Sequence, residues 1–450
     1  MMITDVARML QRDFRGQMLF RDSPGFAEAS AIWNAMAQRT PGLILKCAGT
    51  DDVQRAVRAA AAAGLPVAIR CGGHSLAGFS TCEGGVVIDL AMIRSTQVDP
   101  SRRTARVQGG CLLGDIDSAG QRAGLAFPAG VVSHTGAAGL ILGGGTGWLT
   151  RRYGLSCDNV LEFEVITAEG AMVRASAAEN GDLFWALRGG GGNFGVVTAF
   201  QLQMHPLRSV VLATATCEER QMAGVLRSWG DFMAGAPDEL KWNISLAKAA
   251  NGRPALNQTI IWAGDGAQGE KFLRAALAAG SPANVNIREM PYLALQTMAD
   301  ADFPHGQRYY TKSGYFHSLS GKSVETMLQK TESMPSRKSQ IELAFLGGAS
   351  SRVGPGETAF GDRSAPILLN ILGQWCEPAN DAENVSWVRS VFGALRPGMA
   401  PGVYVNFMSG DEQDRVREAY RTRWDRLLQI KQAWDPNNFF CRNQNIPGKI

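Results

Sequence analysis

The chain has 450 residues, of which 45% are hydrophobic and 19% charged, a balance typical of a globular protein long enough for two domains. Its 45 Lys and Arg residues against 41 Asp and Glu leave a formal net charge of +4. This charge is too small and too evenly spread to indicate a nucleic acid or an anionic membrane as partner. The first 14 residues, MMITDVARMLQRDF, contain no uninterrupted apolar run, so we expect no signal peptide and a cytoplasmic protein.

The eight cysteines are expected to be reduced packing residues, because none forms a CxxC pair and no leader points to an oxidising compartment. The five histidines are scattered, with no pair at the spacing of metal ligands. The composition therefore predicts no metal site.

Short strands and helices broken by glycine are expected up to residue 207. A helix over 52–64 and a strand over 66–69 lead into the loop Arg70-Cys71-Gly72-Gly73-His74-Ser75. Paired glycines after a strand let backbone N–H groups approach a diphosphate, because no Cβ holds the ligand away. The loop thus favours a nucleotide cofactor with His74 beside its reactive end; the alternative is a glycine turn with an unrelated histidine. Further expected elements are strands over 86–90, 104–107, 160–167 and 195–200 and a helix over 182–187.

Two other glycine-rich segments need separate interpretations. Residues 123–150 contain no charged residue, but eight glycines and Pro128 argue against a membrane helix, since each glycine costs a helix about 1 kcal/mol. A buried cofactor loop explains the missing charge better. Residues 190–195 match the pattern GxGxxG, yet a helix precedes them and a strand follows. A dinucleotide-binding Rossmann motif needs the reverse order, so we predict no NAD site there.

After Pro206 helices and strands alternate and are longer. We expect helices over 219–234, 269–279 and 323–332 and strands over 240–247, 258–263, 340–346 and 366–375. This order predicts an antiparallel sheet with helices on one face, which can cover a cofactor. A last helix is expected over 411–433, before Asp435-Pro436.

Four motifs occur in order along the chain: PVAIRCGGHSLAGFS, the segment GVVSHTGAAGLILGGGTGWL, the segment WALRGGGGNFGVVTAF, and YVNF followed by WDPNNFFCRNQNIPG. Together they resemble the FAD-linked oxidases with a berberine-bridge-enzyme C-terminal segment, within the vanillyl-alcohol-oxidase-type flavoproteins. The resemblance covers about residues 39–448 and is loose over 209–398. It implies an α+β fold with a PCMH-type FAD-binding domain (1–207), a substrate domain with a helix-covered antiparallel sheet (208–400), and a C-terminal segment (401–450) that returns to the FAD domain.

The resemblance also implies how FAD is held. His74 matches the histidine that bonds to the 8α-methyl group of the flavin. Val132 stands where many relatives carry a second linking cysteine, so His74 is expected to form the only covalent link, as in a bacterial branch of the family. Cys157 lies well downstream and is interpreted as a packing residue. The expected FAD-binding residues are Arg70, Cys71, Gly72, Gly73, His74, Ser75, Gly130, Ser133, Thr135, Gly136, Gly139, Gly143, Gly144, Gly145, Gly147, Val197, Tyr404 and Asn406.

The catalytic residues are less clear from the sequence. Many relatives carry a tyrosine base at the position of Phe407 and a carboxylate near Leu368, and both positions are apolar here. Other polar candidates are Tyr315, His317 and Asn370, besides Tyr309 and Tyr310, and for each of them the alternative is a structural role.

The implied activity is oxidation of a small organic molecule by hydride transfer to FAD, with O₂ as the final acceptor. Oxidation of an alcohol needs a positioned base, whereas a neutral amine expels hydride with its own lone pair. The apolar base positions therefore favour an amine, an N-heterocycle or a hydroquinone-like compound. Two alternatives stay open: an alcohol or sugar oxidase, and a flavoprotein that sequesters an aromatic compound with little turnover.

Overall fold

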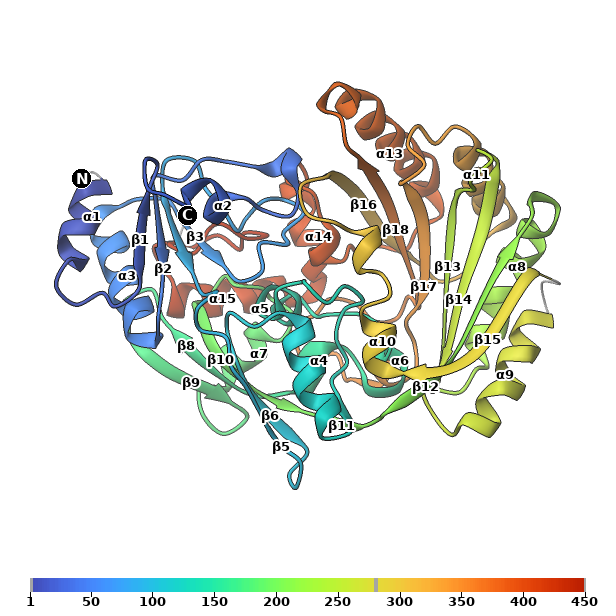
Figure 1. Cartoon of the computed structure of the whole chain (residues 1–450), viewed down its shortest axis with the longest axis horizontal. Helices are drawn as coiled ribbons and strands as arrows, with labels where there is room; N and C mark the ends of the chain where they lie inside the picture. Colours follow the sequence, from blue (N-terminus) through green and yellow to red (C-terminus); the bar gives the residue numbers. More distant parts are fainter. Residues whose placement is uncertain (1–2, 279–281, 449–450) are drawn as a thin grey trace.

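Three main β-sheets organise the computed structural model, which describes residues 3–278 and 282–448 (Figure 1). The first sheet has four strands in the order β1-β2-β4-β3, and β2, β4 and β3 are parallel. Helix α3 (Thr50–Ala63) connects β2 to β3 and ends at Gly64, whose left-handed backbone (φ 62°) stops the helix. The strands are β1 (Gln17–Phe20), β2 (Leu43–Lys46), β3 (Val67–Arg70) and β4 (Val86–Asp89), with α1 (Ile3–Leu10) packed against α3 and α2 (Phe26–Ser30) near β2.

The second sheet is antiparallel and has the order β5-β6-β10-β8-β9. Its strands are β5 (Thr96–Asp99), β6 (Thr104–Gln108), β8 (Val160–Ile166), β9 (Met172–Ser176) and β10 (Val196–Gln203). Around it lie α4 (Leu113–Arg122), α5 (Ala137–Leu142), α6 (Thr150–Tyr153), α7 (Gly181–Leu187) and the two-stranded ladder of β7 (Leu125–Ala126) and β11 (His205–Pro206). The expected helix–glycine loop–strand order around residues 190–195 is confirmed by α7 and β10.

The uncharged segment 123–150 forms the short strand β7, the short helix α5, the start of α6 and the loops between them. Among residues 3–278 and 282–448, no helix is both long and apolar enough to cross a membrane.

The third sheet has seven antiparallel strands in the order β15-β12-β14-β13-β17-β18-β16. One face packs against helices, and the other looks toward the first two sheets (Figure 1). The strands are β12 (Ser209–Cys217), β13 (Leu240–Lys248), β14 (Pro254–Trp262), β15 (Ala283–Pro291), β16 (Arg308–Phe316), β17 (Gln340–Phe345) and β18 (Ile367–Trp375). The helices are α8 (Glu219–Ala234), α9 (Gly266–Ala278), α11 (Gly321–Glu332) and α13 (Asp381–Leu395), besides the short α10 (Tyr292–Gln296) and α12 (Ala349–Arg352).

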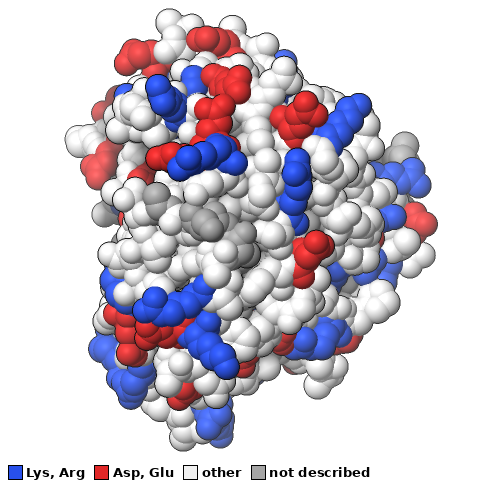
Figure 2. Space-filling view, turned by 90° about the vertical axis from the view of Figure 1, so that its right-hand side faces the viewer, with Lys and Arg blue, Asp and Glu red and all other residues white. Residues whose placement is uncertain are grey.

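The helix-covered antiparallel sheet expected from the second half of the sequence is confirmed. The expected helix over 269–279 begins earlier, at Gly266, and its last expected residue lies outside the described residues. Figure 2 looks onto the helical side of this half and shows Lys and Arg side chains interspersed with Asp and Glu. Positive and negative charges are thus mixed on this face, as the nearly balanced composition predicts.

The C-terminal segment crosses back to the first half of the chain (Figure 1). Val403, Met408 and Val416 pack in the same hydrophobic cluster as residues of α4, α5 and α7. The single helix expected over 411–433 is wrong: α14 (Val416–Tyr420) and α15 (Trp424–Trp434) are separated by a break at Arg421, whose φ is 49°. A left-handed arginine cannot continue a right-handed helix, so the chain turns there.

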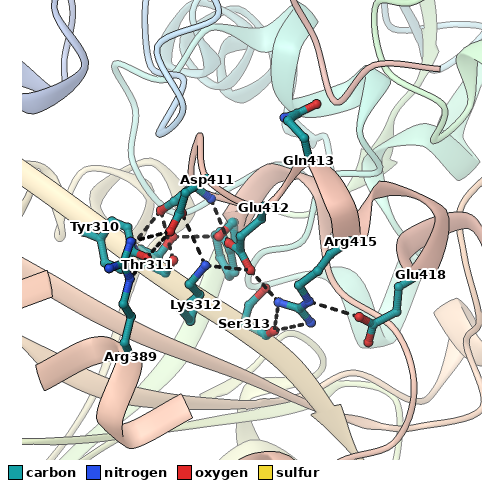
Figure 3. Close-up of polar contacts among 12 residues, drawn as sticks. Tyr310, Thr311, Lys312, Ser313, Arg389, Asp411, Glu412, Gln413, Arg415 and Glu418 are labelled. Carbon is teal, nitrogen blue, oxygen red and sulfur yellow. Dashed lines mark hydrogen bonds and ion pairs between the residues drawn. The ribbon is translucent and has the colours of Figure 1, made fainter. Parts of the chain in front are cut away.

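A partly buried ionic network fastens this returning segment to β16 (Figure 3). Tyr310 donates a hydrogen bond to Asp411 at 2.7 Å, and Lys312 lies 3.4 Å from Glu412. Glu412 also pairs with Arg415 at 2.5 Å, and its side chain is only 1% exposed. Together with the hydrogen bond from the Thr311 hydroxyl to the carbonyl of Phe407, the network fixes residues 407–412 against the edge of the seven-stranded sheet.

Candidate active site

A cavity of about 370 Å³ lies between the seven-stranded sheet and the other two sheets. Its wall includes apolar residues in or next to strands of the first two sheets, among them Val67, Ile69, Leu90, Val196 and Val197. The glycine loops and residues of β16, β17 and β18 complete the wall. The cavity therefore joins the segments that the sequence motifs single out.

Two glycine loops meet in the cavity wall. A Cβ atom on Gly72 would lie 2.5 Å from the backbone nitrogen of Gly136, and one on Gly136 would lie 2.4 Å from the nitrogen of Gly72. Both distances are shorter than atomic contact permits, so glycine is required on both sides. The pair brings the loop after β3 onto the N-terminus of α5.

The surroundings of this contact suit an anionic group. Among the described residues, the backbone N–H groups of Gly73, His74 and Ser75 have no hydrogen-bond acceptor. Arg442 lines the cavity too, and its buried Nε has no hydrogen-bond partner among residues 3–278 and 282–448. Unused donors beside a glycine loop are what a diphosphate requires, so these residues fit the FAD that the sequence motifs imply. Sequence reasoning missed Arg442, which only the fold brings into the cavity wall, where its guanidinium donates to the carbonyls of Gly78 and Thr81 downstream of the glycine loop.

His74 lies in the cavity wall with a fixed ring. Its imidazole stacks on Trp33, with the ring centroids 4.1 Å apart, and Trp33 stacks in turn on Tyr309 at 3.6 Å. Burial, reinforced by the neighbouring His134 and His305, holds the pKa of His74 well below its ordinary value. The imidazole is therefore neutral at neutral pH and keeps a lone pair available for bond formation.

The cysteines near the cavity differ in access to it. Val132 lines the cavity, and it stands where many relatives carry a second linking cysteine. Cys157 does not line it and packs with Leu155 and Phe360 in a separate apolar cluster. Cys71 lines the cavity, but its thiol donates to the carbonyl of Cys111 at 3.2 Å, and burial raises its pKa to about 12. Cys71 is thus a thiol and not a reactive thiolate.

The returning segment places Tyr404 and Asn406 in the cavity wall. The Asn406 amide donates to the carbonyl of Leu140 at 3.0 Å and to the Tyr404 hydroxyl at 2.9 Å. The same hydroxyl accepts the N–H of Gly145 at 3.0 Å, and burial raises the pKa of Tyr404 to about 12. These bonds tie residues 404–406 to the loop around α5.

Thirteen of the expected FAD-binding residues line the cavity: Cys71, Gly72, Gly73, His74, Ser75, Gly130, Thr135, Gly136, Gly139, Gly143, Val197, Tyr404 and Asn406. Five lie behind this wall. The guanidinium of Arg70 donates to the carbonyls of Ala29 and Ala31, and Ser133 bonds to Asp300. The others are Gly144, Gly145 and Gly147. These five shape the loops without lining the cavity.

A carboxylate that sequence reasoning missed lies at the sheet end of the cavity. Glu342 on β17 and Asn370 on β18 are cross-strand neighbours, and both line the cavity. Burial raises the pKa of Glu342 to about 7, although the hydrogen bond from Asn370 opposes this rise. The sequence IELAF carried the signal, because Glu342 is the single carboxylate among the alternating apolar residues of the strand expected over 340–346. The face that Glu342 occupies becomes known only when the strands are paired.

The other catalytic candidates are placed differently. Asn370 lines the cavity, whereas Tyr315 packs with Leu368 and Phe360 outside it and His317 lies exposed beyond the end of β16. The structure therefore brings neither Tyr315 nor His317 to the cavity, because Tyr315 on β16 faces a separate apolar cluster and His317 follows the last residue of that strand. Tyr309 is stacked on Trp33, and the Tyr310 hydroxyl is bonded to Asp411.

Comparisons with known proteins agree with this arrangement. The FAD binding domain family matches residues 41–176, and the berberine and berberine-like family matches residues 403–447. An FAD-linked oxidoreductase of Bacillus subtilis, itself uncharacterised, is 32% identical over 96% of this chain and 97% of its own length. The (R)-6-hydroxynicotine oxidase of Paenarthrobacter nicotinovorans is 29% identical over 96% of each chain.

Solved structures show the same relationship. The crystal structure of 6-hydroxy-D-nicotine oxidase from Arthrobacter nicotinovorans superimposes with a TM-score of 0.89 at 27% identity, covering 97% of this chain and 98% of that one. Both matched families include the cavity loops, since one contains His74 and residues 130–147 and the other contains Tyr404 and Arg442. FAD is accordingly the cofactor of this chain. The chain belongs to the FAD-linked oxidoreductases that combine an FAD binding domain with a berberine-like C-terminal segment.

Proposed function

We propose that this oxidoreductase removes a hydride from a small amine or N-heterocycle, using FAD bound covalently through His74 alone and dioxygen as the final acceptor. The observation that carries this proposal is one carboxylate, Glu342, held by Asn370 in a mainly apolar end of the cavity. A single buried carboxylate suits one cationic or proton-donating group on an otherwise apolar molecule.

The surrounding walls support the choice of substrate class. The side chains near Glu342 are mainly apolar and aromatic: Trp33, Leu76, Phe303, Leu372 and Phe407. Thr311 and Asn406 are the polar side chains that accompany the Glu342–Asn370 pair at this end. A sugar needs many hydrogen bonds to replace its hydration, and buried polar groups without partners lose affinity. These walls therefore favour an aromatic or aliphatic amine over an oligosaccharide.

The residues of the chain have distinct tasks in this reaction. When bound, FAD supplies the hydride acceptor and passes the electrons on to dioxygen. Above pH 7 Glu342 is largely ionised, so it attracts the ammonium form of the substrate and takes its proton. The neutral amine that results can expel hydride with its own lone pair. Asn370 donates to Oε2 of Glu342 and thereby orients the carboxylate, while Phe407 and Leu372 exclude water.

Glu342 also supports a second candidate function, the oxidation of a hydroxyl compound. A carboxylate in this position can take the hydroxyl proton of a hydroquinone or an alcohol, so the absence of a tyrosine at Phe407 does not exclude a base. The choice between an amine and a hydroxyl substrate then depends on how the rate follows pH. With an amine, the rate follows the titration of both the free amine and Glu342; with a hydroxyl compound, it follows Glu342 alone.

The deciding experiment is anaerobic flavin reduction in a stopped-flow instrument, with paired sets of amines, hydroquinones, alcohols and sugars. We expect amines or N-heterocycles with an apolar body to bleach the flavin fastest, and aerobic turnover to release hydrogen peroxide. Fast bleaching of the flavin by sugars or simple alcohols, with no fast bleaching by amines or N-heterocycles, would refute the proposed substrate class. Tight binding of an aromatic compound without peroxide release would instead indicate sequestration.

A further inference from the structure

Three histidines from distant parts of the chain meet beside the cavity. His74 follows β3, His134 lies in the loop before α5, and His305 lies in the loop before β16. The ring centroids of His74 and His134 are 5.1 Å apart, and those of His134 and His305 are 4.8 Å apart. His74 lines the cavity, His134 is half-buried behind it, and His305 is exposed. The three rings thus form a path from the cavity to solvent.

The two inner rings have unused nitrogens. Nε2 of His74 and Nδ1 of His134 are both buried, and neither has a hydrogen-bond partner among the described residues. Buried polar atoms are normally paired, so these two indicate a partner that comes and goes, such as a proton or a bridging water. Centroids 5.1 Å apart place adjacent imidazoles within reach of each other, directly or through one water.

The cluster is built rather than accidental. Asp300 accepts hydrogen bonds from the backbone N–H of Ser133 at 2.7 Å and from its hydroxyl at 2.5 Å. Gln296 donates to the carbonyl of Gly130 at 3.1 Å. The loop that carries His134 is therefore fixed from both sides by the segment that leads to His305. Trp33, stacked on His74, fixes the ring at the other end of the path.

The electrostatic surroundings keep the imidazoles of His74 and His305 in their neutral form. Burial and the neighbouring imidazoles lower the pKa of His74, and burial, His134 and Arg70 lower the pKa of His305. Arg70 is the nearby cation, and Asp300 is the nearby carboxylate, which is already bonded to Ser133. His74 and His305 are thus neutral at neutral pH.

We propose that His134 accepts the N–H proton of His74 while a ring nitrogen of His74 bonds to the 8α-methyl carbon of FAD, and that His305 passes this proton to solvent. The inference rests on the covalent attachment at His74 proposed above. An imidazole that is alkylated without losing its N–H proton would remain a cation in a buried site, which is costly. His134 removes that cost as the bond forms.

The atoms and electrons of this attachment balance. One C–H bond of the methyl group and the N–H bond of His74 break, and one N–C bond forms. The electron pair of the C–H bond passes into the flavin ring, which takes up two protons from solvent in place of the two that leave. Dioxygen then removes these two electrons and two protons as hydrogen peroxide, leaving oxidised FAD linked to His74.

The test measures attachment instead of turnover. The protein is produced without bound flavin and is then mixed with FAD in air. The amount of flavin that stays on the polypeptide after acid precipitation is measured over time. We expect His134→Phe to slow attachment about 10²-fold, the lower range for loss of an acid–base group, and added imidazole to restore much of the rate. His305→Gln should slow it less, with the same rescue, and the exposed His317→Gln should match the wild type.

Attachment at the wild-type rate in His134→Phe would overturn the relay. Slow attachment that imidazole does not restore, although FAD still binds noncovalently, would also overturn it, because a merely structural defect gives that result. Should His134→Phe fail to fold, the exposed His305→Gln variant decides, by its rate and its rescue. Absence of covalent flavin from the wild type would refute attachment at His74 itself, which distinguishes that failure from failure of the relay.

Discussion

Asn370 Nδ2 donates a hydrogen bond to Glu342 Oε2 at 2.6 Å across two adjacent strands of the seven-stranded sheet. The neighbours of Asn370 along β18, Leu369 and Ile371, point to the opposite face and pack against the covering helices. Strand alternation thus divides β18 into a core face and a cavity face. The pair gives an apolar chamber one group that can hold or take a proton.

Replacing Glu342 tests the role of this carboxylate. We expect Glu342→Gln to lower kcat/KM by about 10²–10⁴-fold, because the glutamine cannot take a proton. Bound flavin should keep its spectrum, because the substitution is nearly isosteric. Glu325→Gln, on the exposed side of α11, is the matched control and should leave kcat/KM unchanged.

The role of Glu342 also predicts how the rates of the wild type and of Glu342→Gln depend on pH. Because burial raises the pKa of Glu342 to about 7, the wild-type rate should rise as pH increases through about 7, when the carboxylate becomes ionised. This rise of the rate with pH should be absent in Glu342→Gln. A wild-type rate that stays flat between pH 6 and pH 8, within about twofold, would contradict a role for Glu342 in proton transfer.

Asp117 on α4 should lower the stability of the fold as pH rises from about 4 to about 7. Its side chain is buried and accepts a hydrogen bond from Gln296 at 3.0 Å, and burial raises its pKa to about 7. Between about pH 4 and pH 7 the unfolded chain has released this proton while the folded chain retains it, so stability falls as pH rises through that window.

Asp117→Asn removes this titration. We therefore expect the melting temperature of the variant, relative to wild type, to increase by a few degrees between pH 5 and pH 8. The exposed Asp51→Asn should show no such trend. A difference between Asp117→Asn and wild type that is independent of pH would argue that Asp117 is already ionised in the folded protein.

Glu412 should be important for the returning segment. It is buried between Lys312 and Arg415 (Figure 3), and its loss removes the buried carboxylate that both cations share, leaving only the more exposed Asp411 and Glu418 as their partners. Removing one partner of a buried ion pair costs about 3–5 kcal/mol, so Glu412→Gln should unfold at clearly lower urea concentration. Glu270→Gln, which breaks an exposed pair with Arg274, should change stability by less than about 1 kcal/mol. Equal effects of the two substitutions would refute this role of the network.

Asn406 is expected to contact the flavin. Its amide already bonds to Leu140 and Tyr404, and its side chain lies against Gly143, where a Cβ would be 2.1 Å from its Oδ1. Asn406→Leu should therefore shift the flavin absorption spectrum and slow flavin reduction. An unchanged spectrum together with an unchanged reduction rate would show that Asn406 only supports the loop.

Local sequence patterns predicted much of this fold, and long-range pairing explains what they missed. Helix α8 and the start of β13 were predicted at their observed positions, because each shows clear periodicity. Strands β12, β15 and β16 were not predicted, and the break at Arg421 carries no glycine or proline signal. Glycine motifs placed His74 beside a cofactor loop. The sequence could not show that His134 and His305 lie next to His74, nor that Glu342 faces the cavity, since both depend on contacts between distant segments.

The most direct test of the account is the intact mass of the acid-denatured protein, followed by peptide mapping. We expect the wild type to carry the mass of one FAD less two hydrogens, on the peptide that contains His74. His74→Ala should release all its flavin on denaturation, whereas Cys157→Ala should retain it. Flavin that stays attached to the His74→Ala polypeptide, or a linked peptide that lacks His74, would contradict the account.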